Sequence, residues 1–462
     1  MDVPEFDLVV IGSGPAGQKA AIAAAKLRKR VAIVDRPPML GGVCAHTGTI
    51  PSKTMREAVL HLTGFTERTF YGRDYRVKDN ISIQDLAFRT QAIIQRETEV
   101  IRAQLRRNNV TVFEGTARFA GPHAITVSNG GGATELQAAF IVIACGTRPA
   151  HAPGIPFDGT RILDTDQVLA LSGLPRDAIF VGAGIIGLEY ASFFAALGVK
   201  VTLIDQRPQI LDFVDREIME ALTYRLRQLG AIFRLGEKVA RVGLDAGRDE
   251  VFAELESGKR VHGEVLLYSA GRQGNADLLN LEAAALAADA RGRVAVNDCF
   301  QTVVPHVYAA GDVIGFPALA STSMEQGRLA SCHIFGRPAN HVPELFPYGI
   351  YTIPEISMVG QTEEKLTAAK VPYEVGVAKY SELAKSMMIG DEHGMLKLLF
   401  DRTTLKLLGV HAIGERATEI IHIGQAVLAF GGTIEYFRDT VFNYPTLAEA
   451  FKVAALDGLN RL

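Results

Sequence analysis

Two copies of one glycine-rich pattern constrain the fold of this chain more than any other feature. In each copy, three glycines with the spacing Gly-x-Gly-x-x-Gly follow a short apolar run, and an aspartate ends the next apolar run. The spacing from the first glycine to the aspartate is 23 residues in both copies. The first copy comprises Gly12, Gly14, Gly17 and Asp35, and the second comprises Gly182, Gly184, Gly187 and Asp205.

This pattern is typical of a strand, a helix and a second strand that together bind a dinucleotide. The first glycine permits a tight turn, the second lets the backbone approach a pyrophosphate, and the third lets the helix pack closely on the sheet. The aspartate lies where it accepts hydrogen bonds from ribose hydroxyls. One copy alone could be a structural turn. Two copies predict an α/β fold with two Rossmann-like domains and two dinucleotides bound at once.

Length, charge and hydropathy narrow the class of protein. A chain of 462 residues suggests about three domains of ordinary size. The net charge of −3 favours neither a nucleic-acid partner nor an anionic membrane surface. The apolar runs are far shorter than the ~18 residues that a membrane span needs, and no signal-peptide pattern precedes the first strand. We therefore expect a cytoplasmic protein that does not contact the membrane.

The cysteines and histidines predict neither a metal site nor a disulfide framework. The four cysteines, at positions 44, 145, 299 and 332, show no metal-type pairing, and so few in a long chain favour a reducing compartment. None of the 11 histidines falls in a metal-ligand spacing such as His-Glu-x-x-His.

Hydrophobic periodicity predicts the remaining elements. An acid that directly follows a parallel strand lies at the sheet edge where such sheets bind ligands, and Gly311-Asp312 follows one predicted strand in this way. Strand-like runs and two helices after Pro343 predict an α+β domain. We expect helices over 52–64, 84–107, 323–335, 418–430 and 446–459, a loop over 65–80, a hairpin turn at 129–132, and strands over 140–144, 304–310, 396–400 and 405–412.

A stretch between the two glycine-rich patterns, Gly41–Lys53, gives the chain a family resemblance. Together with both patterns, Cys145–Pro149, Tyr308–Asp312 and Asn443–Glu449, it resembles the flavoprotein disulfide reductase family, which includes glutathione reductase and dihydrolipoamide dehydrogenase. The resemblance covers the whole chain. It implies an FAD-binding domain over 1–149 and 272–343, an NAD(P)-binding domain over 150–271, and a dimerisation domain over 344–462 that forms a homodimer or a larger homo-oligomer.

Two departures from the family pattern change the chemistry that the resemblance implies. The family uses two cysteines five residues apart, and after Cys44 the position of the second cysteine is Thr49. A hydroxyl does not cycle between thiolate and disulfide, so electrons cannot pass from the flavin to sulfur. The family's acid–base histidine falls on Tyr444, a phenol whose pKa near ~10 makes it a poor proton shuttle at neutral pH.

With these departures, the chain is similar to one branch of the family, the soluble, Si-face-specific pyridine nucleotide transhydrogenases. The branch resemblance implies an FAD-dependent enzyme in which NADPH reduces the flavin and leaves, after which NAD⁺ enters the same pocket and takes the hydride. The residues with implied catalytic roles are Lys53, Glu189, Cys44, Thr49, Tyr444 and Glu449. The implied FAD-binding residues are Gly12, Gly14, Gly17, Asp35, Arg36, Gly42, Cys44, Lys53, Gly146, Gly311 and Asp312. The implied NAD(P)-binding residues are Gly182, Gly184, Gly187, Asp205, Arg207 and Gly271.

The resemblance also suggests a role for each charged residue of the site. Lys53 is expected near flavin N5 and paired with Glu189, where a cation would stabilise reduced flavin. Asp312 is expected to hydrogen-bond the ribityl or phosphate part of FAD. Asp205 suits the ribose hydroxyls of NAD. Arg207 either pairs with the 2′-phosphate of NADP or is a solvated surface residue.

The roles of the uncharged residues stay open at this point. Cys44 is either a small buried thiol without a redox role or a group that contacts the flavin or forms a reversible sulfenate. Thr49 is expected to fill the space of the missing sulfur. Tyr444 either closes the pocket of the neighbouring subunit or only packs.

Two other functions remain as alternatives. The first is an NAD(P)H diaphorase or oxidase that passes electrons to quinones or oxygen. The second is a degenerate flavoprotein, similar to dihydrolipoamide dehydrogenase, with a non-catalytic binding role. Two complete nucleotide patterns together with Lys53 and Glu189 argue against a pure scaffold, and the spectral response of the flavin to NADPH would separate the two classes.

Overall fold

The computed structural model describes residues 4–72, 74–338 and 345–462 of the chain. The chain divides into two compact units. Unit 1 comprises Met1–Thr54, Ala87–Ala150 and Gly271–Pro343, and unit 2 comprises Met55–Leu86, His151–Ala270 and Glu344–Leu462. The predicted domain boundary between residues 343 and 344 lies outside the described residues.

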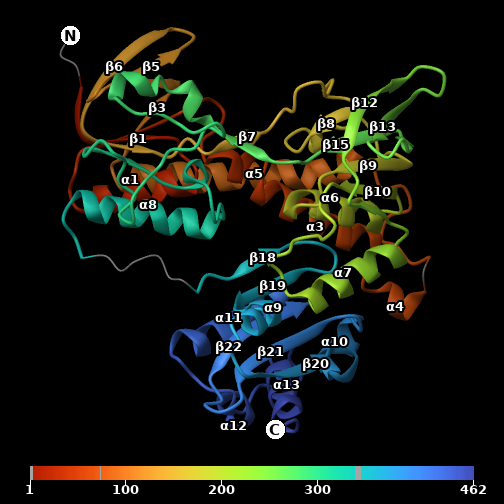
Figure 1. Cartoon of the computed structure of the whole chain (residues 1–462). Coiled ribbons are helices and arrows are strands. Elements are labelled where there is room, and N and C mark those ends of the chain that lie inside the picture. The colour runs from red at the N-terminus through yellow and green to blue at the C-terminus, as the bar shows by residue number, and fades with distance from the viewer. Residues whose placement is uncertain (1–3, 73, 339–344) are drawn as a thin grey trace. The chain divides into compact units, whose positions relative to one another are not determined.

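Unit 1 contains a seven-stranded sheet that is parallel at its centre (Figure 1). Its strands are β1 (Glu5–Ile11), β2 (Val31–Asp35), β3 (Thr111–Glu114), β4 (Thr116–Gly121), β5 (Ala124–Asn129), β6 (Gly132–Ile143) and β17 (Val307–Ala309). The order is β3-β2-β1-β6-β5-β4, and β17 also pairs with β6. Leu8, Val9 and Val10 of β1 have no exposed surface, as expected for a parallel strand covered on both faces.

Two helices of unit 1, α1 (Pro15–Lys26) and α8 (Ala320–Ile334), lie side by side (Figure 1). A Cβ atom on Gly327 would lie 2.0 Å from the carbonyl oxygen of Ala16, so this close approach requires glycine. Ser331 Oγ donates a hydrogen bond of 2.6 Å to the carbonyl of Ala20. Unit 1 also contains α2 (Gly42–His46) and the paired strands β7 (Thr147–Pro149) and β16 (Arg272–Gly274). Helices α3 (Thr49–Thr63) and α5 (Ile83–Arg107) each have residues in both units, because Met55–Leu86 belong to unit 2.

The central part of unit 2 repeats the parallel arrangement. Its strands are β8 (Ile162–Asp164), β9 (Asp177–Val181), β10 (Lys200–Asp205), β11 (Ile232–Leu235) and β15 (Val265–Tyr268), in the order β11-β10-β9-β15-β8. Helix α6 (Ile185–Ala196) is buried from Gly187 to Ala196, which fits its lack of a polar face. This part also contains α7 (Arg216–Gln228) and a three-stranded antiparallel sheet of β12 (Val239–Asp245), β13 (Glu250–Leu255) and β14 (Arg260–Gly263).

The C-terminal part of unit 2 is an antiparallel sheet with helices, which confirms the α+β prediction. The order is β18 (Tyr348–Ile350), β19 (Ile356–Gly360), β22 (Leu407–Ile413), β21 (Met395–Asp401) and β20 (Tyr373–Lys379). Phe400, Phe437 and Phe451 are fully buried in its core. The helices of unit 2 outside the parallel part are α4 (Arg68–Tyr71), α9 (Glu363–Ala368), α10 (Ala384–Ile389), α11 (Ala417–Ala429), α12 (Glu435–Asp439) and α13 (Glu449–Leu459).

Several predicted elements have different bounds in the structure. Helix α3 begins at Thr49 and not at residue 52, because Pro51 falls in its first turn, where a missing N–H costs little. A short helix, α4, interrupts the predicted loop over 65–80. Helix α13 begins at Glu449, since residues 446–448 form a turn in which Thr446 Oγ1 donates to the carbonyl of Asn443 at 2.7 Å. Strand β17 is shorter than the predicted 304–310. No helix in the described ranges is both long and apolar enough to cross a membrane.

A buried lysine links α7 to the antiparallel sheet of unit 2. Lys397 on β21 and Asp215, which precedes α7, are both 0% exposed. Lys397 Nζ lies 3.0 Å from Asp215 Oδ1 and 3.0 Å from Glu217 Oε2, and it also contacts Glu363 Oε1. Burial alone would lower the pKa of Lys397, but the three carboxylates raise it overall. The lysine therefore stays charged and neutralises the carboxylates of Asp215 and Glu217 at the start of α7.

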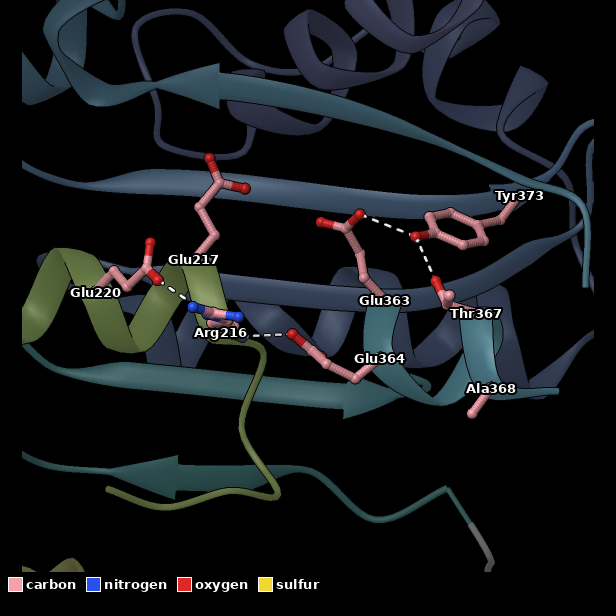
Figure 2. A pocket seen from close by; sticks show the side chains of 8 residues that line it. All are labelled: Arg216, Glu217, Glu220, Glu363, Glu364, Thr367, Ala368 and Tyr373. Carbon is pink, nitrogen blue, oxygen red and sulfur yellow. Dashed lines mark hydrogen bonds and ion pairs between the residues drawn. The ribbon is translucent and has the colours of Figure 1, made fainter. Parts of the chain in front are cut away.

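Two of these carboxylates, those of Glu217 and Glu363, line a pocket of about 660 Å³ (Figure 2). Asp215, Glu217 and Glu363 place oxygen atoms within 4.8 Å of one another, a spacing that can hold a metal ion. The Lys397 ammonium lies among these oxygens, so it occupies the place that a cation would take. The pocket is lined by Arg216, Glu217, Glu220, Glu363, Glu364, Thr367, Ala368 and Tyr373.

We predict that Lys397→Met destabilises the protein strongly. The substitution preserves volume but leaves the buried Asp215 carboxylate without its counter-charge, which should lower the free energy of unfolding by about 3–5 kcal/mol. Unfolding in urea, followed by circular dichroism, measures the change. Lys238→Met is the control, because the Lys238–Glu256 pair is exposed on both sides, and it should not change stability measurably. Equal unfolding midpoints for Lys397→Met and wild type would contradict the prediction.

Candidate active site

The first glycine-rich loop, between β1 and α1, is shaped by two glycines that no other residue can replace. Gly12 has a φ of +103°, and a Cβ there would lie 2.2 Å from the carbonyl oxygen of Ala144. A Cβ on Gly17 would lie 1.9 Å from the carbonyl oxygen of Gly12. A Cβ on Gly14, by contrast, would have no heavy atom within 4 Å. The loop therefore leaves open space at the glycine where a pyrophosphate is expected.

Asp35, at the end of β2, holds this loop in place through hydrogen bonds with Ser13. Its Oδ2 accepts hydrogen bonds from Ser13 N at 2.7 Å and from Ser13 Oγ at 2.5 Å, and its Oδ1 accepts one from Arg36 N at 2.7 Å. Burial raises the pKa of Asp35, and these hydrogen bonds offset part of the rise. Ser13 Oγ also accepts a hydrogen bond from Gly41 N at 2.8 Å, which ties the loop to the Gly41–Lys53 stretch.

Cys44 and Thr49 lie together in unit 1, since the Thr49 side chain is near enough to lower the pKa of the Cys44 thiol. Burial raises the pKa of the Cys44 thiol, and the Thr49 side chain and the charge of Lys53 only partly offset the rise. The thiol is therefore protonated at neutral pH and is a poor nucleophile. The structure thus places a hydroxyl beside the sulfur, and none of the four cysteines, all described, is in a disulfide.

Polar groups on three elements of unit 1 gather around Asp312. This residue follows β17, and Gly311 before it has a φ of +83° and donates its N–H to Gln326 Oε1 at 2.9 Å. Burial raises the pKa of Asp312, while Arg272 and hydrogen bonds from Ser323 and Thr147 lower it in part. A half-buried acid held by hydroxyl donors and one arginine can remain available to the hydroxyl groups of a ligand.

The residues of unit 1 fit FAD, the cofactor that the family resemblance implies. The hydroxyl of Thr47 is buried and has no hydrogen-bond partner in the described structure, so a polar group is missing beside the Cys44 helix. Gly14 and Gly146 leave their Cβ positions open. Gly42 lies so close to the backbone of Gly14 that a Cβ on Gly42 would be 2.9 Å from Gly14 Cα. These features describe a cradle for a ligand with phosphate and hydroxyl groups.

The second glycine-rich loop, between β9 and α6, repeats this geometry in unit 2. Gly182 has a φ of +101°, and a Cβ there would lie 2.9 Å from the carbonyl oxygen of Ser269. A Cβ on Gly187 would lie 2.0 Å from the carbonyl oxygen of Gly182. A Cβ on Gly184 would again have no neighbour within 4 Å. Both loops therefore have one shape, with open space at the second glycine.

Asp205 and Arg207 form a compact pair at the end of β10. Asp205 Oδ2 accepts hydrogen bonds from Ala183 N at 2.7 Å and from Arg207 Nη2 at 2.7 Å. Its Oδ1 accepts hydrogen bonds from Arg207 N at 2.8 Å and from Arg207 Nε at 3.0 Å. Burial alone would raise the pKa of Asp205, but the bonds from Arg207 lower it overall. Arg207 replaces the hydroxyl that Ser13 supplies in the first loop, and its side chain remains 45% exposed.

Glu189 is buried on α6 with only 3% of its surface exposed. Its Oε1 accepts a hydrogen bond of 2.9 Å from Tyr351 N.

Tyr444 and Glu449 differ in their exposure to solvent. Tyr444 is 71% exposed. Glu449 Oε2 is buried and has no hydrogen-bond partner in the described structure.

The predicted site residues are divided between the two units. Unit 1 contains the FAD-binding set, with Cys44, Thr49 and Lys53, and also Gly271, which was predicted to bind NAD(P). Unit 2 contains the rest of the NAD(P) set, with Glu189, Tyr444 and Glu449. The pairing of Lys53 with Glu189 joins residues of different units and stays a prediction.

Sequence reasoning missed a buried ion pair in unit 2. Arg56 on α3 and Glu355 before β19 are 3% and 4% exposed, and Arg56 Nη2 lies 3.7 Å from Glu355 Oε2. The only signal in the sequence was an arginine between the apolar residues Met55 and Val59, which are both fully buried. Nothing in the spacing indicates that its partner lies in a segment near residue 355.

We predict that Glu355 makes stability depend on pH. Burial raises the pKa of Glu355 from 4.5 to about 7, with Arg56 lowering it and Glu415 raising it further. Between these values the folded protein holds a proton that the unfolded chain has released. The free energy of unfolding should therefore fall as the pH rises through this range, by ~3 kcal/mol at most.

The variant Glu355→Gln isolates this effect, because it keeps the shape of the side chain and removes its ionisation. Thermal midpoints of wild type and variant, measured near pH ~5 and near pH ~8, give the comparison. We expect the wild type to lose stability relative to the variant on going to the higher pH. Parallel pH profiles for the two proteins would contradict the assignment.

Comparisons with known proteins agree with this geometry. A family model described as "Pyridine nucleotide-disulphide oxidoreductase" matches residues 6–327, and the model of its dimerisation domain matches residues 346–455. The soluble pyridine nucleotide transhydrogenase of Mycobacterium tuberculosis is 56% identical over 460 residues, which cover 99% of this chain and 98% of that protein. The protein of the same name from Colwellia psychrerythraea is 45% identical over 464 residues, covering 99% of each.

Solved structures show the same relationship. LpdA from Mycobacterium tuberculosis is similar with a TM-score of 0.89 and 26% identity, over 98% of this chain and 99% of that chain. The HOCl-induced flavoprotein disulfide reductase RclA from Escherichia coli has a TM-score of 0.88 and 26% identity, with the same coverage. The chain therefore belongs to the pyridine nucleotide-disulphide oxidoreductase family.

Proposed function

We propose that this protein is an FAD-dependent transhydrogenase that converts NADPH and NAD⁺ into NADP⁺ and NADH. One hydride moves from NADPH, which is oxidised, to NAD⁺, which is reduced, so the reaction balances without a further reactant. The observation that carries the proposal is that Thr49, a hydroxyl residue, lies beside Cys44 at the position where a disulfide would need a second thiol. The name and high identity of the two transhydrogenases above support the same activity.

The chain contributes binding, orientation and charge to this reaction. FAD, when bound, supplies a two-electron carrier that accepts and returns the hydride. The set from Gly12 to Asp312 named above would hold FAD, with Asp35 and Arg36 at the adenosine end. Lys53 and Glu189 would act as a charged pair near the reacting ring, and Cys44 would remain a buried thiol without a redox role.

The nicotinamide dinucleotides would share the second loop in turn. Asp205 would accept hydrogen bonds from the ribose hydroxyls of NAD, as acids at this position do. The Arg207 guanidinium, which lies on Asp205 and is 45% exposed, would turn to the 2′-phosphate of NADP. Asp205 would bind NAD and Arg207 would bind NADP, so a pocket with both side chains suits an enzyme that must accept both nucleotides.

We propose a homodimer formed through the C-terminal part of unit 2, in the cytoplasm. Three apolar or aromatic side chains of this part are largely exposed, namely Phe430 at 91%, Val441 at 90% and Tyr444 at 71%, and a second copy of the chain would cover them. Tyr444 and Glu449 would then face the site of the partner subunit. The proposed domains are 1–149 with 272–343 for FAD, 150–271 for NAD(P), and 344–462 for dimerisation.

The proposed function predicts rapid reduction of thio-NAD⁺ by NADPH and no turnover of lipoamide or oxidised glutathione. Spectrophotometric assays of the purified yellow protein test both statements. Titration with dithionite should reach full reduction at ~2 electrons per flavin and not ~4, because no thiol pair shares the electrons. Slow thio-NAD⁺ reduction with fast consumption of quinone or oxygen would instead make the protein a diaphorase or oxidase.

The Asp205–Arg207 pair predicts opposite effects of two substitutions on nucleotide choice. Asp205→Ala should lower kcat/KM for NADH about tenfold while sparing NADPH, because it removes a charged ribose acceptor. Arg207→Ala should lower kcat/KM for NADPH by a similar factor and spare NADH. Steady-state assays with both nucleotides give the four ratios. Equal losses for both nucleotides in either variant would rule out that residue as the discriminating ligand.

A further inference from the structure

A short segment of unit 2, Tyr351–Glu355, is held by two neighbouring side chains of α6. Tyr351 N donates to Glu189 Oε1 at 2.9 Å, and Ile353 N donates to Ser192 Oγ at 3.0 Å. Glu189 and Ser192 are three positions apart on the helix and are 3% and 0% exposed, so they lie on one buried face. The backbone of the segment therefore sets where the Glu189 carboxylate lies.

A second set of contacts to the segment comes from α3. Arg56 Nε donates to the carbonyl of Thr352 at 3.1 Å. This carbonyl belongs to the residue between Tyr351 and Ile353, whose two amides bind α6. Arg56 Nη2 also lies 3.7 Å from Glu355 Oε2, at the end of the segment. The guanidinium thus holds the segment at two points while α6 holds it at two others.

Stability alone does not account for the Arg56–Glu355 pair. The contact of 3.7 Å with Glu355 is too loose to offset the cost of burying the Arg56 guanidinium, whose closer carboxylate is Glu57 Oε1 at 3.0 Å, and an apolar pair of similar volume would be about as stable. The Arg56–Glu355 pair does provide a fixed position, because Glu355 is also tied to α11 through Thr418 Oγ1 at 3.3 Å. The contacts favour a geometric purpose for the two residues.

Helix α3 gives this geometry a link to the chemistry. The helix runs from Thr49 to Thr63 and carries both Lys53 and Arg56, three positions apart. In the proposed function, Lys53 and Glu189 are the charged residues that act on hydride transfer. The Tyr351–Glu355 segment contacts α3, the helix that carries Lys53, and also the side chain of Glu189.

We propose that Arg56 and Glu355 are positioning residues, which fix the orientation of the Glu189 carboxylate by holding the Tyr351–Glu355 segment. This inference rests on the role of Glu189 in the proposed function. Arg56 and Glu355 do not touch the nucleotides in this account. They act through the Tyr351 amide, and their loss should slow the hydride step more than it weakens nucleotide binding.

The first test compares Arg56→Leu with wild type, each purified with FAD bound. We expect the rate constant of flavin reduction by NADPH, measured by stopped flow, to fall about tenfold, because small misplacements of catalytic groups are costly. The apparent Kd for NADPH should change less than about twofold. Arg56→Lys, which keeps the charge, should recover part of the rate. An unchanged rate in a folded, FAD-loaded Arg56→Leu variant would overturn the proposal.

The matched control is Arg161→Leu on the surface of unit 2. Arg161 makes the same kinds of contact as Arg56, since its Nη1 donates to the carbonyl of Asp249 at 3.0 Å and its Nη2 lies 2.9 Å from Asp249 Oδ1. Its side chain is 36% exposed and its partner's is 85% exposed. This variant should leave the rate of flavin reduction unchanged, and a loss equal to that of Arg56→Leu would overturn a specific role for Arg56.

A double-variant cycle separates the positioning role from the role of Glu189. If Glu189→Gln slows flavin reduction and Arg56→Leu adds no further loss in that background, the two residues act through one group, as proposed. Additive losses, or a slow Glu189→Gln variant beside a fast Arg56→Leu variant, would overturn the positioning role alone. A fast Glu189→Gln variant would instead overturn the proposed role of Glu189.

Hydrogen–deuterium exchange provides a readout that does not depend on activity. Exchange of the Tyr351 and Ile353 amides should speed up in Arg56→Leu and stay at the wild-type rate in Arg161→Leu. If Arg56→Leu does not accumulate as a folded protein, Ser192→Ala is the deciding variant. It removes the acceptor of the Ile353 N–H and, within α6, the hydrogen bond that Ser192 Oγ donates to the Glu189 carbonyl at 2.7 Å. Faster exchange and a rate of flavin reduction about threefold lower would support the proposal, and wild-type values would overturn it.

Discussion

Each nucleotide loop of this protein depends on one hydrogen bond between a loop amide and a carboxylate at the end of the second strand. In unit 1 the donor is Ser13 N and the acceptor is Asp35, and in unit 2 they are Ala183 N and Asp205. Both bonds measure 2.7 Å. A charged acceptor makes such a bond short and strong, so it fixes the loop before any ligand binds. The loops then differ in the side chain that donates to this carboxylate, which is the Ser13 hydroxyl in unit 1 and the Arg207 guanidinium in unit 2, the loop expected to meet NADP.

The motifs that fix local geometry could be read from the sequence. Gly12, Gly17, Gly182 and Gly187 each meet a carbonyl oxygen where a Cβ would stand, so their spacing encodes the turn directly. The strands that precede them are buried apolar runs, which periodicity detects. The bounds of α3 were less readable, because a proline in a first turn gives no sign of whether the helix begins before or after it.

Contacts between distant segments could not be read in the same way. The Arg56 bond to Thr352 spans 296 positions, and the Lys397 bond to Asp215 spans 182. A lysine in an apolar strand and an arginine in an apolar helix face both look like interruptions of a core, since charged residues are almost never fully buried unless paired. Their partners follow from the packing of unit 2 and from no local pattern. The pairing of Lys53 with Glu189 is a long-range contact of the same kind and remains a prediction.

Two buried cations of unit 2, Lys397 and Arg56, differ in how their charge is compensated. Lys397 contacts three carboxylates directly, and its hydrogen bonds satisfy the ammonium well enough to offset burial. Arg56 has a hydrogen bond to a backbone carbonyl, a loose contact with the buried Glu355 and an ion pair of 3.0 Å with Glu57, whose side chain is 57% exposed, so it gains less from its carboxylates. In the proposed function, which uses no sulfur relay, the chain contributes orientation and charge to hydride transfer. Misplacement of a catalytic group by ~1 Å can cost ~10²-fold in rate, so under the proposed function a buried arginine that fixes the position of Glu189 is worth its cost in stability.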